Sequence, residues 1–157
     1  LLDAFEKFKH PKKRLHIAGS TKVSDSKFYL DKIKGNDKII MHGKTNKQDL
    51  IKLYNYADVF VLPTLEEGYS IVINEALACG CPVIVTTNSG AEEYVNENRC
   101  GMVIPICNSD KILENLEILA SDKNLRDEFS FNASKTETRR SWDDYTNDLN
   151  DEIVNLM

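Results

Sequence analysis

The sequence lacks two features that would mark a membrane or nucleic-acid-binding protein: a long apolar run and an excess of positive charge. A membrane-spanning helix needs about 20 consecutive apolar residues, whereas the longest apolar runs here, near residues 58–63 and 81–87, have the length of strands. The net charge of −5 offers no broad electrostatic attraction to nucleic acid or anionic lipid. We therefore expect no nucleic-acid partner and no membrane-spanning segment.

The first residues, Leu-Leu-Asp-Ala-Phe, include no methionine and neither the basic segment nor the small-residue cleavage site of a signal peptide. We interpret the chain as a piece cut from a longer cytoplasmic protein. No internal repeat or low-complexity segment divides its 157 residues. The length is that of one domain, which we expect to span residues 1–157.

Cysteine is scarce, and its spacing does not match a zinc ribbon or a zinc finger. A C-x-C pair such as Cys79–Cys81 could bind a metal, but here it lies between two apolar segments. We expect reduced, buried thiols at all four positions, which are Cys79, Cys81, Cys100 and Cys107.

Short apolar runs alternate with helical patterns along the chain. The runs are β-branched and nearly continuous, as in strands covered on both faces, and they span residues 15–19, 38–43, 58–63, 82–87 and 101–105. Apolar residues recur at helical spacing over 50–57 and 112–120, and residues 1–8 also have a helical pattern. This alternation predicts an α/β fold with a doubly wound, parallel, Rossmann-like sheet. A charged helical tail is expected from about residue 121.

The first predicted element is a helix, so we expect the strand that should precede it to lie upstream of these residues. In a doubly wound sheet that strand is central, and the loop at its end often helps to hold phosphate. Part of the binding site is therefore expected to lie outside this sequence.

Ligands of an open α/β sheet bind in the crevice beyond the carboxyl ends of its strands. That rule selects the loops of small or polar residues at 19–20, 43–45, 63–70 and 86–90. The third of these loops runs directly into a predicted helix over 71–78. The free N–H groups at that helix start form an anion site, and Gly68 lets a ligand approach the backbone closely.

Two carboxylates, Glu67 and Glu75, flank a stretch without charge. Glu75 could accept hydrogen bonds from both hydroxyls of a ribose, as an acidic residue does in nucleotide-binding folds, while Glu67 would lie beyond the far side of the phosphates. The alternative is structural, with Glu67 stabilised by the helix dipole and Glu75 on a solvated helix face. Spacing alone favours the structural alternative.

Two other enzyme classes fit poorly. A glycoside hydrolase needs two carboxylates about 5–5.5 Å apart for retention or about 6.5–9.5 Å apart for inversion. Eight residues of helix rise about 12 Å, so this pair brackets a larger ligand. A dinucleotide-dependent oxidoreductase is disfavoured because no G-x-G-x-x-G motif follows a predicted strand.

The segment around the two acids resembles the donor-site signature of GT-B-fold retaining glycosyltransferases, notably family 4; it reads EEGYSIVINEALACGCPVIVTTNSGAEEYV. In that family a Glu–Gly–aromatic–small loop is followed, eight residues after its first Glu, by a second Glu and then Ala–hydrophobic–Ala–x–Gly–x–Pro–Val. Glu67 and Glu75 fit this spacing, and Glu66 does not. Four further segments occur in the order expected of the family's C-terminal domain: LHIAGS, IIMHGKTNKQDLIKLYNYADVFVLPT, NENRCGMVIP and LRDEFSFNASKTETRRSW. The similarity therefore covers nearly the whole chain.

The resemblance implies roles for individual residues. Glu75 would bind the ribose hydroxyls of a nucleotide sugar, and Glu67 would lie by the donor sugar, as electrostatic support or to position the donor. The other implied donor contacts are the backbone amides of Gly68, Tyr69, Ser70 and Ile71 to sugar hydroxyls and diphosphate, Gly43, Lys44 and Thr45 beside the base, and Gly19 and Ser20 on the opposite wall.

The resemblance also implies a function. The full protein would be a retaining hexosyltransferase that moves a sugar from a UDP- or GDP-sugar to a glycan or lipid acceptor, as in polysaccharide biosynthesis. It implies no cofactor and no metal. The acceptor would be held by an N-terminal domain outside this sequence, and any peripheral contact with the inner membrane face would come from that half. This fragment alone should catalyse nothing measurable.

The sequence departs from the family pattern at two positions: Ser70 stands where glycine is common, and SGAEEYV lacks a proline often found before its Glu. The family's basic pair that neutralises the diphosphate lies upstream, and Lys44 does not replace it. Two alternatives remain. One is another GT-B enzyme, such as a nucleotide-sugar 2-epimerase, and the other is a domain that has lost catalysis and serves as an interaction module. Base, sugar, acceptor and linkage are not specified.

For the strand histidines and the residues of the C-terminal tail, we mostly expect a structural role rather than a role in ligand binding. His16, within a strand, is predicted to be structural, whereas His42, at a strand end, is a candidate ligand contact. Trp142 could anchor the last helix to the sheet or to a neighbouring domain. Arg139 and Arg140 are typical of a solvated helix end.

Overall fold

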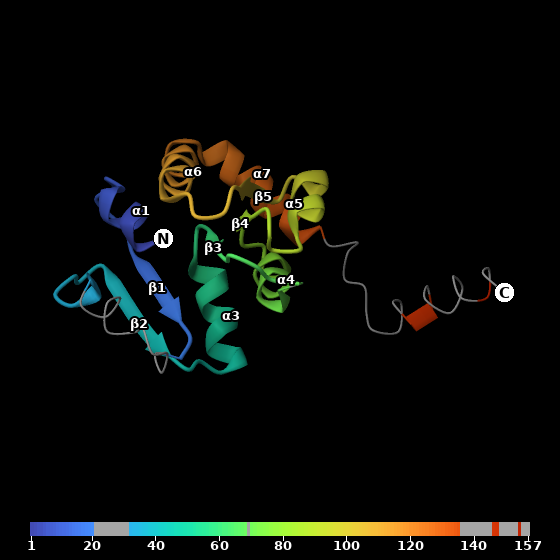
Figure 1. The fold of residues 1–157 in the computed structure, drawn as a ribbon, viewed down its shortest axis with the longest axis horizontal. Helices are drawn as coiled ribbons and strands as arrows, with labels where there is room; N and C mark the ends of the chain where they lie inside the picture. The colour runs from blue at the N-terminus through green and yellow to red at the C-terminus, as the bar shows by residue number, and fades with distance from the viewer. Residues whose placement is uncertain (21–31, 69, 136–145, 148–153, 155–157) are drawn as a thin grey trace.

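The structure is a computed structural model that describes residues 1–20, 32–68, 70–135, 146–147 and 154. From β2 to α6, strands and helices alternate along the chain (Figure 1). In chain order the elements are α1 (Leu2–Lys7), β1 (Leu15–Ala18), β2 (Ile39–Gly43), α3 (Lys47–Tyr56), β3 (Phe60–Leu62), α4 (Ile71–Ala78), β4 (Val83–Thr86), α5 (Glu92–Asn98), β5 (Gly101–Ile104), α6 (Ser109–Ser121) and α7 (Lys123–Ser134).

The strands form two parallel sheets rather than the single sheet that the sequence predicts. In the first, β1 pairs with β2, and Leu15 lies beside Ile39. In the second, β4 pairs with β3 on one side and with β5 on the other. Every pairing is parallel, which confirms the predicted α/β class. The division falls between β1 and β3, which share no backbone hydrogen bond in the described residues.

Helices cover both faces of the three-stranded sheet. On one face, side chains of α3, α4 and α5 pack against Val83 and Val85 of β4. On the other face, α1, α6 and α7 pack against Ile84. Successive side chains of a strand point to opposite faces, so a continuous apolar run is what a strand between two helical layers requires.

Burial differs sharply between the two sheets. Val83, Ile84 and Val85 are 0% exposed, whereas no residue of β1 or β2 is fully buried. β4 therefore has the full burial that the sequence predicts, whereas β1 and β2 are mostly only partly buried. The physical reason is their position, because the β1–β2 pair stands apart from β4, β5 and the helices around them (Figure 1).

β5 approaches β4 closely at Gly101. A Cβ atom at this position would lie 2.1 Å from the carbonyl oxygen of Val83, far inside the roughly 3.5 Å at which non-bonded atoms attract each other. Only glycine allows this strand pairing without a shift of the backbone.

The predicted helices over 50–57, 71–78 and 112–120 correspond to α3, α4 and α6, and the predicted first helix corresponds to α1. α7 lies in the predicted helical tail. Trp142, Arg139 and Arg140 lie outside the described residues. No helix within the described ranges combines the length and the apolar character that crossing a membrane requires.

Candidate functional site

The loop between β3 and α4 carries Glu67 and is tied to the end of the neighbouring strand. The backbone N–H of Glu67 donates to the carbonyl oxygen of Asn88 at 2.9 Å. The hydroxyl of Thr86, which is buried, donates to the carbonyl oxygen of Thr64 at 2.9 Å. These two bonds fix the loop at the carboxyl end of the sheet, where the Glu67 side chain is exposed.

The helix that follows this loop begins without a side-chain partner for its first N–H groups, although the N–H of Ile73 donates to the backbone carbonyl oxygen of Ser70 at 3.0 Å. Ser70, at the N-cap of α4, makes no side-chain capping bond, and the first turn holds no acidic residue. The first N–H groups of a helix have no partner within the helix, and the helix dipole adds partial positive charge there. Next to them Gly68 is exposed, with no atom within 4 Å of the position that a Cβ would take. The start of α4 can therefore accept an anion.

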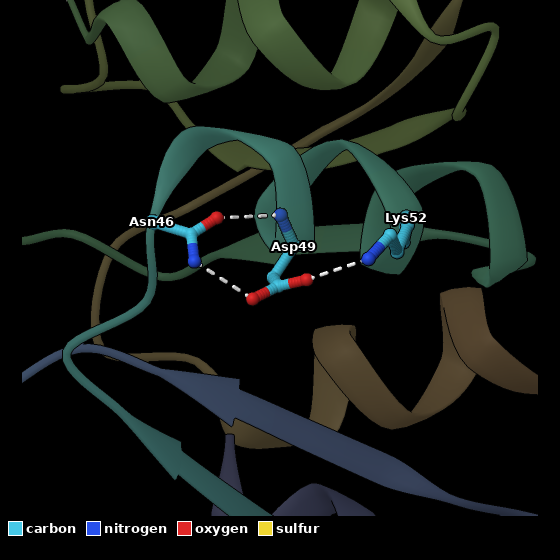
Figure 2. Close-up of polar contacts among 3 residues, drawn as sticks. All are labelled: Asn46, Asp49 and Lys52. Atoms are coloured by element: carbon cyan, nitrogen blue, oxygen red, sulfur yellow. Dashed lines mark hydrogen bonds and ion pairs between the residues drawn. The ribbon is translucent and has the colours of Figure 1, made fainter.

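The other described helices begin with groups of their own. In α3, Asn46 accepts from the N–H of Asp49 at 2.9 Å, and the Asp49 carboxylate accepts from the Asn46 amide and the Lys52 ammonium, both at 2.8 Å (Figure 2). Asn108 and Asp122 cap α6 and α7 in the same way. α1 and α5 carry acidic residues in their first turns. Among the helices α1 and α3–α7 in the described part of the chain, α4 alone has neither a side-chain cap nor an acidic residue in its first turn.

Glu75 is half-buried on α4, where α4 contacts α3. Burial raises the pKa of Tyr54 on α3 to about 12, and the negative charge of Glu75 contributes. The pKa of the Cys79 thiol is also raised, by burial and then by the same carboxylate. Glu75 takes part in none of the ion pairs between described residues. Its charge is thus close to the interface of α3 and α4 without an opposite charge to match it.

The loops after β1 and β2 are joined to each other. The N–H of Gly19 donates to the carbonyl oxygen of Gly43 at 2.8 Å, and the Thr45 hydroxyl donates to the same oxygen at 3.1 Å. Gly43 has a φ of 64°, which glycine adopts without the steric cost that other residues meet. Ser20 and Lys44 are exposed and, with Thr45, line one end of a groove between β1 and β3.

The predicted site residues thus fall into two groups. The hydrogen bonds described above join residues within the first group and tie Glu67 of the second group to Asn88, and none of them runs between the groups. The first group, at the ends of β1 and β2, contains Gly19, Ser20, Gly43, Lys44 and Thr45. The second, around the start of α4, contains Glu67, Gly68, Ser70, Ile71 and Glu75. Tyr69 lies outside the described residues.

Sequence reasoning assigned no role to the residues that hold the second group in place. Thr86 and Asn88 belong to a loop that the crevice rule selects, and polar residues directly after an all-apolar strand were a visible signal. Tyr54 has no such signal, because in the sequence it is only one member of an apolar helical stripe. Its position beside Glu75 depends on how α3 packs against α4.

The two strand histidines contact each other. Nδ1 of His16 lies 2.9 Å from Nε2 of His42, and the rings stack with centroids 5.1 Å apart. The ring of Tyr56 packs edge-on against His16. Burial, followed by the charges of His42 and Arg14, lowers the pKa of His16. A ligand contact of His42 stays a prediction.

The cysteines are free thiols with different surroundings. Burial raises the pKa of Cys81 to about 12 and that of Cys100 to about 11. Cys81 and Cys100 are buried as predicted, Cys79 is only partly buried, and Cys107 is exposed, so the prediction of a buried thiol is wrong at Cys107. It follows β5 in a turn and has a φ of 55°. No group of three or more potential metal ligands occurs in the described ranges.

A shallow cavity of about 610 Å³ lies over the start of α5, and none of its lining residues belongs to either group. Three of the residues that line it are acidic: Glu92, Glu93 and Glu97. Three like charges repel a diphosphate, so this cavity does not suit a nucleotide.

The fold places parallel strands between two helical layers. At the carboxyl ends of these strands, a glycine-containing loop leads into a helix without a side-chain cap. This arrangement is typical of an α/β domain that binds a phosphate-bearing ligand. Within that class, the chain belongs to the glycosyl transferases group 1 family, whose model matches residues 1–136.

Individual relatives agree with this assignment. The chain is 33% identical over 135 residues to an uncharacterized glycosyltransferase of Methanocaldococcus jannaschii, which covers 83% of this chain and 34% of the relative. It is 29% identical over 89 residues to N,N'-diacetylbacillosaminyl-diphospho-undecaprenol alpha-1,3-N-acetylgalactosaminyltransferase of Campylobacter jejuni, covering 57% of this chain and 24% of the relative. The chain therefore spans about a third or less of the length of these relatives.

The fold matches that of solved GT-B glycosyltransferases. HepE of Anabaena, solved in complex with UDP, matches with a TM-score of 0.83 and 20% sequence identity over 100% of this chain and 44% of its own. The structural match extends the family assignment to the three-dimensional fold.

Proposed function

We propose that the chain is the donor-binding domain, over residues 1–157, of a hexosyltransferase that uses a nucleotide diphosphate sugar and retains the configuration of the transferred sugar. The proposal is supported by the family match over residues 1–136. It is also supported by the UDP complex of HepE and by the lipid-diphosphate acceptor named for the Campylobacter jejuni relative. The acceptor of the longer protein is a glycan or a lipid, held by residues outside this chain.

The start of α4 carries the proposal. A nucleotide diphosphate sugar presents two phosphate groups, and the first N–H groups of α4 have neither a side-chain cap nor a first-turn acid to compete with them. A helix start of this kind binds phosphate through N–H donors and the helix dipole. In this proposal the backbone amides of Gly68, Tyr69, Ser70 and Ile71 hold the diphosphate and the nearest sugar hydroxyls.

The two acids have separate roles on either side of the diphosphate. Glu75 accepts hydrogen bonds from the ribose hydroxyls, and these bonds compensate a half-buried carboxylate that lacks an ion-pair partner. Glu67, exposed on a loop that is tied to Asn88, lies by the donor sugar. There its negative charge supports positive charge that develops on the sugar as the bond to phosphate breaks.

The loops after β1 and β2 form the base side of the site. Gly43, Lys44 and Thr45 contact the base, largely through backbone groups, and Gly19 with Ser20 closes the opposite wall. The hydrogen bond from Gly19 to Gly43 keeps the two loops together. Transfer then depends on positioning and electrostatics and requires no metal, so a chelator should leave the rate unchanged.

The test uses the full-length protein with its natural donor class. Glu67→Gln should lower sugar transfer by at least about 100-fold, the range for loss of one group that stabilises a transition state. Glu66→Gln is the matched control, since it removes the neighbouring charge from a residue outside the motif spacing, and it should keep most of the rate. Equal rates for both variants would contradict the role of Glu67. Analysis of the sugar product separates transfer from epimerisation.

Nucleotide binding is tested separately, by thermal shift with UDP, GDP and ADP on the full-length protein. At ten times its Kd a ligand adds about 1.4 kcal/mol of stability. One nucleotide should raise the Tm, and Glu75→Ala should abolish that rise while Glu66→Gln keeps it. A rise that survives in Glu75→Ala would contradict the ribose contact. No rise with any nucleotide would contradict the proposed function.

A further inference from the structure

The pairing of β1 with β2 changes register just before the loops that follow the two strands. Ile17 lies beside Met41. The next residue of β1, Ala18, lies beside Gly43, so β2 has one residue more than β1 over this step. The extra residue is His42, and an extra residue of this kind is a β-bulge. Bulges turn a side chain in a new direction and are frequent next to active sites.

The ring of the bulged residue meets a second histidine. Nδ1 of His16 lies 2.9 Å from Nε2 of His42, and the ring planes are 15° apart. A neutral imidazole has one N–H donor and one acceptor nitrogen, so one ring can donate to the other across the two strands. Both strands lie wholly within the described residues, and this is the only side-chain hydrogen bond between them.

The histidine pair lies directly before the loops that we assign to the base. Gly43 follows His42, and its carbonyl oxygen accepts from the N–H of Gly19 at 2.8 Å and from the hydroxyl of Thr45 at 3.1 Å. A side-chain bond across β1 and β2 at this point fixes the two strand ends relative to each other. It therefore also fixes where both loops begin.

These strand ends have little other support among the described residues. No residue of β1 or β2 is fully buried. The loop before α4, by contrast, is bonded to Thr86 at the end of β4, where Val83 and Val85 are 0% exposed. The base side of the site therefore depends more on local hydrogen bonds than the phosphate side does.

We propose that His16 and His42 are a positioning pair for the base side of the nucleotide site. Their hydrogen bond holds the bulge of β2 against β1 and so keeps residues 19–20 and 43–45 in the arrangement that accepts the base. Neither ring has to touch the nucleotide. This inference rests on the proposed function, because it gives the pair a role in nucleotide binding.

The number of protons on the pair decides whether this bond exists. With no added proton, or with one, one of the facing nitrogens donates and the other accepts. With two added protons both facing nitrogens carry a hydrogen, and the bond is lost. Burial, followed by the charges of His42 and Arg14, lowers the pKa of His16 from its ordinary value of about 6.5. The pair therefore resists the second proton and keeps its bond at neutral pH.

The other groups around the pair do not stabilise a second proton. Tyr56 of α3 presents its ring edge to His16. Asp58 and Lys44 line the same groove as His16. In the described part of the chain, no carboxylate forms an ion pair with either histidine.

The test measures the Kd of UDP, GDP and ADP for the full-length protein at pH 8 by calorimetric titration. His42→Leu removes the bond and should raise the Kd of the nucleotide that binds about three- to tenfold, the range for loss of one hydrogen bond. His42→Gln keeps a donor and an acceptor and should keep the Kd within about twofold. His42 is exposed, so neither change opens the core.

His10→Gln is the matched control. His10 stacks on Phe8 and lies outside β1 and β2, so this change should leave the Kd as it is. A loss of affinity in His10→Gln as large as that in His42→Leu would overturn the inference.

The pH profile separates positioning from a merely structural role. The ratio of the wild-type Kd to the Kd of His42→Gln, taken at each pH, cancels the titration of the nucleotide phosphates. This ratio should be near one at pH 8 and rise at least about threefold by pH 5, because only the wild-type pair can take a second proton.

Equal Kd values for His42→Leu and the wild type, or a ratio that stays constant from pH 8 to pH 5, would overturn the inference. Equal losses in His42→Leu and His42→Gln would also overturn it, because the ring rather than the hydrogen bond would then be required. If the wild type bound none of the three nucleotides, the proposed function itself would fail. The two failures are therefore distinguishable.

Discussion

Helices α3 and α4 both follow a parallel strand and a loop at the same edge of the fold, yet they begin in opposite ways. α3 begins with a polar network in which Asn46 and Asp49 bond to each other and Lys52 neutralises the acid (Figure 2). α4 begins with Ser70, which makes no capping bond, and with the exposed side chain of Ile71. One helix start has side-chain partners within the chain, and the other has no side-chain cap.

The difference shows that the absence of a stabilising side-chain cap can indicate a binding site. Capping a helix start contributes about 1 kcal/mol, and α3, α6 and α7 all use this device. α4 has no such cap. At its start, a bound anion and a capping side-chain oxygen would compete for the same backbone N–H groups. We therefore interpret the uncapped start of α4 as a requirement of the site.

The largest expected effect comes from giving α4 the acid that α3 has. Ile71→Glu should raise the stability of the free protein by about 0.3–1 kcal/mol, because a carboxylate in the first turn interacts favourably with the helix dipole. The same charge should repel the diphosphate and weaken nucleotide binding at least about tenfold, or 1.4 kcal/mol. Calorimetric titration and urea unfolding of the same preparation measure both quantities.

Gln48→Glu, in the first turn of α3, is the matched control for Ile71→Glu. It adds the same charge to the other helix start and should change nucleotide affinity little. Equal losses of affinity in the two variants would indicate a general charge effect and would contradict a binding site at α4.

The second expected effect is on stability alone. Asn46→Ala removes the side-chain cap of α3 and should cost about 1 kcal/mol, measured as a lower urea midpoint. Ser70→Ala removes a hydroxyl that makes no capping bond and should cost clearly less. A larger cost for Ser70→Ala would mean that α4 is capped in solution and would remove the contrast between the two helices.

The smallest expected effect is on pH dependence. The hydrogen bond from Lys52, then that from Asn46, lowers the pKa of Asp49. The folded state therefore favours the ionised carboxylate. Its contribution to folding stability is fully present above the unfolded pKa of about 3.9. That contribution is lost as the pH falls through the lower pKa of the folded state. The stability difference between the wild type and Asp49→Asn should shrink below about pH 4. A difference that is constant down to pH 2 would contradict the network in Figure 2.

Much of the fold is predictable from the sequence because it is encoded by local pattern. The β-branched run at 82–87 predicts a strand covered on both faces, and β4 has that environment. The division into two sheets is not predictable in this way. The runs that form β1 and β4 look alike, and their different burial depends on which strand lies beside them.

The candidate site is predictable to a similar degree. The spacing of Glu67 and Glu75 and the crevice rule together select the loop before α4. The crevice rule also selects the loop that contains Asn88, but not its bond to Glu67. The position of Tyr54 beside Glu75 was not predictable, since it depends on tertiary packing. The exposure of Cys107 was not predictable for the same reason, because we expected all four thiols to be buried and the turn after β5 exposes this one.

The most direct test of a nucleotide at the start of α4 is an NMR titration of the full-length protein with UDP and, separately, GDP. With one of the two nucleotides, the backbone amide signals of Ile71, Val72 and Ile73 should shift in a saturable way, while those of Gln48 and Asp49 in the first turn of α3 should stay in place. Shifts confined to α3, or no shift at α4 at saturating concentrations of both nucleotides, would contradict the account.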